Sequence, residues 1–260
     1  MWFDEIMDDC REGFEIACKN KKLFIPLFIK NALDMFFFIL WFTVVMLIFI
    51  AHGRDLKTIL NSPDNLSNLL LFLFFACLTF YLYFTLFSAI FEAGSINLYK
   101  TIVSGLEPKA QYFFQGVKKY FLKILGGIFL FHIVFIIFCI PIIIVLVIYT
   151  FTIGILTAGW GIVFLGIVVN VYFATWPVAM VADDLEPVQA IGTGIKLGRK
   201  HFWELFILVL ASGMISRFLV SVFGSLIVFV GGWFISGIIE AYFKLVLLLF
   251  YMRKREEIMG

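Results

Sequence analysis

Seven acidic or basic side chains stand inside long apolar stretches of this chain, and one asparagine accompanies them. The set is Lys30, Asp34, Glu92, His132, Asn170, Arg217, Glu240 and Lys244. A charge at the centre of a membrane costs about 2.5 to 3.5 kcal/mol on insertion scales, so such groups usually face the interior of a bundle or a wet cavity. These residues form a candidate intramembrane polar site, where the chemistry would be the binding or passage of a small solute or a lipid.

Two pairs within this set are four positions apart. Lys30 with Asp34, and Glu240 with Lys244, can form ion pairs across one helical turn, and the second pair has the more favourable order. Such pairs can neutralise charge so that a helix inserts, or they can line a pathway. The sequence leaves both interpretations open.

Arg217 has no acid four residues away. Its helical neighbours Gly213, Ser221 and Gly224 form a face of small residues, which is typical of close helix contacts. This pattern predicts that Arg217 points into the bundle. Because the other intramembrane acids have local partners, Glu92 is its predicted partner.

The sequence contains no recognisable catalytic or metal-binding motif. The histidines His52, His132 and His201 are scattered, without an H-E-x-x-H pair, and there is no Gly-Lys phosphate loop. His132 alone is more typical of a hydrogen-bonded interior histidine than of a proton carrier. The four cysteines lack C-x-x-C spacing, so neither a disulfide framework nor a zinc site is indicated. We predict no catalytic residue, metal or cofactor, and the pattern disfavours a membrane-embedded enzyme.

Six apolar runs must position these side chains. The chain has 260 residues, is 63% hydrophobic and has a mean hydropathy of +1.05, whereas soluble domains are about 45 to 50% apolar. A hydrocarbon core needs about 20 helical residues to cross. The runs that qualify are roughly 23–51, 66–98, 122–148, 153–181, 203–230 and 233–251. The predicted fold is an all-α, polytopic membrane bundle of six transmembrane helices with interfacial amphipathic helices, in a single domain over 1–260.

Basic residues set the predicted orientation. Most of the 20 Lys and Arg residues lie in four stretches, which are 11–22, 100–123, 196–200 and 253–255. Positive charge concentrates on the cytoplasmic side of membrane proteins, so both termini are predicted to be cytoplasmic. The net charge of +2 gives no nucleic-acid signature. The expected partners are the lipid bilayer and its anionic headgroups.

The chain also shows a weak threefold repeat of an amphipathic helix followed by a two-span hairpin, with units of about 1–99, 100–182 and 183–260. Its clearest trace is the motif Leu106-Glu107-Pro108, which recurs as Leu185-Glu186-Pro187. Proline suits the first turn of a helix, and a preceding acid complements the positive helix end. Spaced apolar residues after each motif, and in the first 20 residues, predict three helices that lie in the membrane interface.

A second trace of the repeat lies in the even-numbered spans. The motif Ser88-x-x-x-Glu92-Ala93 recurs as Ser236-x-x-x-Glu240-Ala241, and Asn170 stands at nearly the same place in the fourth span. Matching depth predicts a pseudo-threefold ring of Glu92, Asn170 and Glu240.

The stretch from Asp184 to Ile191, then Lys196 and His201-Phe202-Trp203 at the start of a span, carries a resemblance, as does the similar stretch from Leu106 to Leu122. It resembles a broad group of uncharacterised bacterial and archaeal six-span proteins that includes the membrane domain attached to some glycerophosphodiester phosphodiesterases. The resemblance implies the fold and a location in the cytoplasmic membrane of a prokaryote. The soluble phosphodiesterase domain and its acidic metal ligands are missing, so that activity is not implied.

Two functions remain open. In one, the protein binds or transports a small solute or lipid through a cavity lined by Glu92, Arg217, Glu240 and Lys244. In the other, it is a non-catalytic scaffold or accessory subunit that recruits a membrane or cytoplasmic protein partner through its interfacial helices. Fold class alone does not decide between them.

Overall fold

The computed structural model describes residues 2–52, 63–153, 155–224 and 230–259, and all of its regular elements in these ranges are helices. They are α1 (Trp2–Lys19), the 3-10 helix η1 (Lys21–Phe24), α2 (Ile25–His52), α4 (Pro63–Val103), α5 (Ala110–Ile153), α6 (Ile155–Phe173), α7 (Trp176–Asp183), α8 (Pro187–Lys200), α9 (Phe202–Gly224), α10 (Val230–Lys254) and α11 (Glu256–Met259). The predicted all-α fold class is confirmed.

Six segments of the described chain are long and apolar enough to cross a membrane. They are Lys21–Ile48, Ser67–Val103, Ala110–Ile137, Phe164–Asp183, Phe202–Leu219 and Phe234–Lys254. Each overlaps one of the six predicted runs. The protein is therefore a multi-pass integral membrane protein.

The helix α5 differs from the prediction of a separate interfacial helix after Pro108. It runs for 44 residues without a break, from the amphipathic segment straight into the span. No proline occurs between Pro108 and Pro141, so every backbone N–H in this stretch can continue the helix. By contrast, the other two amphipathic segments, α1 and α8, are separate helices.

The predicted fourth span is divided into α6 and α7. The break falls at Ala174 and Thr175, and Pro177 occupies the first turn of α7. Because proline lacks an N–H donor and its ring clashes with the carbonyl four residues earlier, α6 cannot continue past Phe173. The displaced α7 packs on α5, where Gly127 leaves room for the Trp176 ring: a Cβ at this position would lie 2.3 Å from Trp176 Cζ3.

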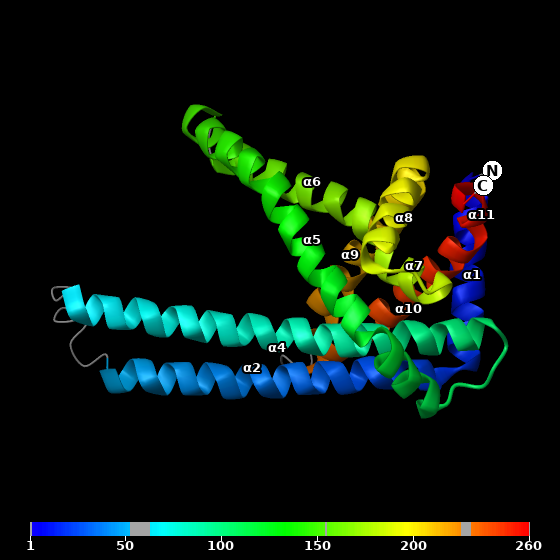
Figure 1. Ribbon diagram of the computed structural model, residues 1–260, viewed down its shortest axis with the longest axis horizontal. Coiled ribbons are helices and arrows are strands. Elements are labelled where there is room, and N and C mark those ends of the chain that lie inside the picture. Colours follow the sequence, from blue (N-terminus) through cyan, green and yellow to red (C-terminus); the bar gives the residue numbers. More distant parts are fainter. Residues whose placement is uncertain (1, 53–62, 154, 225–229, 260) are drawn as a thin grey trace.

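The long helices diverge from a common end of the molecule. Figure 1 shows the α2–α4 hairpin and the α5–α6 hairpin spreading apart from the region where both chain ends, α1, α7, α8 and α11 gather. We call this region the base. Buried apolar residues concentrate there, between Ala89 and Ile102 on α4 and between Ile239 and Tyr251 on α10. Only 6% of an 18-residue apolar stretch of α4 is buried, so most of this stretch is left for lipid to cover.

The end of α10 ties the base together. Arg253 Nη2 lies 2.8 Å from Asp9 Oδ1 of α1, and Lys254 Nζ lies 2.5 Å from a carboxylate oxygen of Glu5. On the other side, Arg255 pairs with Asp183 at the end of α7 at 3.0 Å. The last turn of α10 and the residue that follows it thus hold both α1 and the broken fourth span.

Candidate intramembrane polar cavity

Lys244 of α10 lies between two carboxylates from different helices. Its Nζ lies 2.8 Å from Glu240 Oε1, one turn earlier on the same helix, and it donates a hydrogen bond to Glu92 Oε2 of α4. The side chains of Lys244 and Glu92 are 17% and 21% exposed, whereas Glu240 is 39% exposed. The predicted Glu240–Lys244 ion pair is confirmed, and Glu92 joins it.

Small buried residues lie next to this cluster on both α4 and α10. Ala93 and Ala241, each directly after a cluster carboxylate, are fully buried, and so is Ala89 one turn earlier on α4. Side chains this short let two helix backbones approach, which is how helices commonly associate in membranes. The long Lys244 side chain can then reach across the contact to Glu92.

The cluster forms part of the wall of a cavity of about 640 Å³. Four long helices, α4, α6, α9 and α10, and the start of α7 contribute to it. The polar residues that line it are Glu92, Asn170, Ser212, Arg217, Glu240 and Lys244. We call this space the polar cavity.

Five of the eight predicted site residues therefore line one cavity, namely Glu92, Asn170, Arg217, Glu240 and Lys244. They include all three members of the predicted ring, although the threefold repeat itself stays a prediction. No function follows from this placement alone.

The other three predicted residues are not among those that line the polar cavity. Lys30 Nζ and Asp34 Oδ2 form the predicted ion pair on α2, 2.9 Å apart. His132 is half-buried on α5 and its Nδ1 lies 2.7 Å from the Ile128 carbonyl oxygen, with the Tyr81 ring close to it. The predicted hydrogen bond of His132 is present, and its role stays a prediction.

The predicted Arg217–Glu92 pair is wrong. Glu92 bonds to Lys244, and Arg217 forms no ion pair with any residue that the structure describes. Arg217 lines the cavity but is exposed, as are its helix neighbours Met214 and Phe218. The prediction failed because it assigned Lys244 to Glu240 alone, whereas an ammonium group can serve two carboxylates.

The expected close packing at Gly213 is also absent. A Cβ at Gly213, or at Gly166 on α6, would meet no atom within 4 Å, and both glycines line the polar cavity. Their missing side chains enlarge the cavity instead of drawing helices together.

Two buried hydroxyl groups near the cluster escaped the sequence analysis. Ser95 and Tyr99 are fully buried on α4. They follow Glu92 by three and seven residues, so all three lie on one helical face. That spacing was the available signal, but both side chains are uncharged, so the search for charged groups inside the apolar runs did not select them.

No family model, curated protein or solved structure matches the chain. The resemblance to the six-span group therefore stays a prediction. Function has to be argued from the cavity.

The polar cavity combines a neutralised region with an unpaired cation. Lys244 balances much of the charge of Glu92 and Glu240, whereas the Arg217 guanidinium has no anion among the described residues. A guanidinium presents paired N–H donors that match a carboxylate or phosphate. The Asn170 amide adds a donor and an acceptor without charge. The arrangement can hold a small molecule that has one anionic group.

Proposed function

We propose that this protein binds a small solute or a lipid with an anionic group in the polar cavity, and transports it across the membrane. The observation that carries the proposal is Arg217, an arginine within the apolar helix α9 that lines a cavity without an ion-pair partner among the described residues. Intramembrane charges are costly and usually functional. An anionic ligand would supply the missing partner.

The size of the cavity supports this function. Small-molecule sites commonly enclose about 300 to 1,000 Å³, and this one encloses about 640 Å³. Gly166 and Gly213 contribute to that volume because their missing side chains leave it open.

Native mass spectrometry of gently solubilised protein tests the proposal. We expect a discrete small molecule or lipid to remain on the wild type, and to be lost from Arg217→Leu, which removes the charge, and from Gly213→Leu, which fills the space. Arg199→Leu is the matched control, because Arg199 is an exposed arginine on α8 that does not line the cavity. The same bound masses in all four proteins would rule the proposal out.

A scaffold function is the second candidate, and α1 favours it. This helix packs on α10 at Gly13 and buries Ile6, while Phe3, Met7 and Phe14 are 52%, 53% and 63% exposed. An exposed apolar face of this kind fits the membrane interface or a protein partner. A scaffold function would be favoured if a photo-crosslinker at Met7 captured one protein and the polar cavity carried no ligand.

The location in a prokaryotic cytoplasmic membrane, with both termini in the cytoplasm, belongs to the same proposal. It is supported by the basic residues at the base, which include Arg253, Lys254 and Arg255. Cys18 is exposed on α1, so a membrane-impermeant maleimide should label it in inverted vesicles. Labelling of Cys18 in intact cells would show that α1 lies on the outer side of the membrane, which contradicts the proposed orientation.

A further inference from the structure

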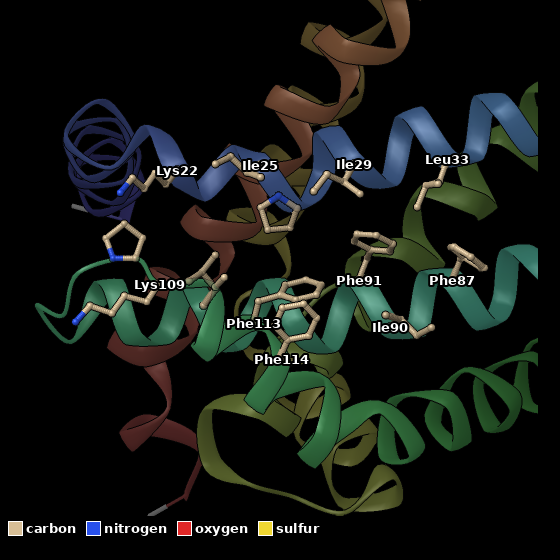
Figure 2. Close-up of a pocket in the computed structure, with 14 residues that line it drawn as sticks. Lys22, Ile25, Ile29, Leu33, Phe87, Ile90, Phe91, Lys109, Phe113 and Phe114 are labelled. Carbon is tan, nitrogen blue, oxygen red and sulfur yellow. The ribbon is translucent and has the colours of Figure 1, made fainter.

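A second hollow lies away from the polar cavity, between α2, α4 and the start of α5. It encloses about 690 Å³, and its lining is apolar apart from two lysines, Lys22 and Lys109. We call it the basal groove. Figure 2 shows both lysines at one end of the groove and Leu33 and Phe87 toward the other end.

The groove has the length of one membrane leaflet. Lys22, Ile25, Ile29 and Leu33 line it from a single face of η1 and α2, spaced by three and four residues. At a rise of 1.5 Å per residue, the 11 steps along the chain from Lys22 to Leu33 span about 16.5 Å. Half of a hydrocarbon core is about 15 Å, so the groove runs from the headgroup level to about the middle of a bilayer.

The floor of the groove is built by close packing. The Phe113 ring lies against α4 at Gly94, where a Cβ would be 2.3 Å from Phe113 Cε2. The Phe91 and Phe113 rings are 5.7 Å apart between centroids. Ile25, Ile29 and Phe114 remain 49%, 49% and 66% exposed beside this floor. A hydrocarbon chain in the groove would cover these exposed side chains.

The charged end of the groove has two lysines without an ion-pair partner among the described residues. Lys22 and Lys109 are both exposed, and neither forms an ion pair with a residue that the structure describes. Glu107 lies two residues before Lys109 but does not line the groove. Two ammonium groups above an apolar channel are complementary to a molecule with an anionic head and a hydrocarbon chain.

We propose that the basal groove binds one molecule of an anionic phospholipid, with its phosphate between Lys22 and Lys109 and one acyl chain along Ile29, Phe91 and Leu33. This site is separate from the polar cavity and its occupant is a resident lipid, not the transported molecule. Removing Arg217 therefore leaves it intact.

Lipid exchange in nanodiscs measured by native mass spectrometry tests this proposal. The probes are phosphatidylglycerol and phosphatidylcholine with identical chains. We expect the wild type to retain phosphatidylglycerol preferentially, and Lys22→Gln/Lys109→Gln to lose that preference by roughly 20- to 30-fold, because each lysine near the surface contributes roughly fivefold to the binding of an anionic lipid.

The matched control is Lys118→Gln/Lys196→Gln, which removes two exposed lysines outside the groove. It should keep the wild-type preference. Ala110→Leu, which places a larger side chain in the lining, should weaken the retention of both lipids. An equal loss in the control would make the preference a general charge effect, and displacement by millimolar inorganic phosphate would identify free phosphate as the occupant. Either result would overturn the proposal.

Discussion

At the scale of single residues, the ammonium group of Lys244 determines whether two carboxylates can stay inside the bundle. Glu92 and Glu240 come from different helices, and Lys244 is the cation that contacts both. Removing one partner of a buried ion pair is strongly destabilising, because it leaves charge without compensation. The cluster therefore stabilises the α4–α10 contact as well as the wall of the polar cavity.

Lys244→Met should lower the free energy of unfolding by about 3 to 5 kcal/mol, because it leaves two carboxylates without their cation. Glu240→Gln should cost much less, because Lys244 keeps its bond to Glu92 and Glu240 is the most exposed of the three side chains. Thermal unfolding in detergent would compare the two variants. Equal losses would show that Lys244 is held by Glu240 rather than by both acids.

Residue types predicted which residues line the polar cavity better than they predicted the ion-pair partners of those residues. Polarity inside apolar runs was enough to select Glu92, Asn170, Arg217, Glu240 and Lys244, which line the same space. Spacing of four also predicted both local ion pairs correctly. The contact between Lys244 and Glu92 depends on the rotation of α10 against α4 and on the reach of a flexible side chain. The spacing of residues in the sequence predicts neither the rotation nor the reach.

At the scale of elements, hydrophobic length predicted the six spans, but local chemistry determined where the helices break. Pro177 divides the fourth span because it removes a hydrogen bond inside an otherwise continuous apolar run. The absence of proline between Pro108 and Pro141 lets α5 merge an interfacial segment with a span. Amphipathic spacing gives the face of a helix, not its angle to the next segment. The groove between α2, α4 and α5 was unpredictable for the same reason.

Adjacent glycines on α5 allow a matched test of the α5–α7 contact. Gly127→Ala should destabilise the protein by about 1 to 3 kcal/mol, because its Cβ would overlap the Trp176 ring. Gly126→Ala should be neutral or stabilising, because the nearest atom to its Cβ is Pro187 Cγ at 3.9 Å. Thermal unfolding of the two variants checks this. If Gly126→Ala were the more destabilising variant, the Trp176 ring would not pack against Gly127.

At the scale of the whole molecule, the described chain is a compact base from which long hairpins diverge (Figure 1). Ion pairs between α1 and the end of α10 close this base. Asp9 is the most deeply buried acid in that contact, with its side chain 1% exposed. Burial raises the pKa of the Asp9 carboxyl from 3.8 to about 6, although the Arg253 guanidinium offsets part of the rise.

Docking of α1 should consequently depend on pH. The docked helix binds the Asp9 proton more tightly than the undocked helix, so protonation of Asp9 stabilises docking. This stabilisation is complete below about pH 4 and is lost as the pH rises through about 6. Amide hydrogen exchange in α1, corrected for intrinsic rates, should be faster at about pH 7.5 than at about pH 5. Asp9→Asn should remove the difference. A pH effect that persists in this variant would have to come from another group, and Glu12 and Glu5 are the acids whose charges act on Asp9.

The contact between α1 and α10 also has a consequence for biogenesis. Arg253 donates a hydrogen bond to the Glu5 carbonyl, and the two residues are 248 positions apart. At about 5 to 20 residues per second, a ribosome needs roughly 10 to 50 s to reach Arg253 after Glu5. During that interval the α10 residues that α1 docks on have not been made, and the apolar residues of α1 must rest on the membrane surface or on a chaperone. The helix α1 therefore reaches its docked position only after α10 has been made, long after its own synthesis.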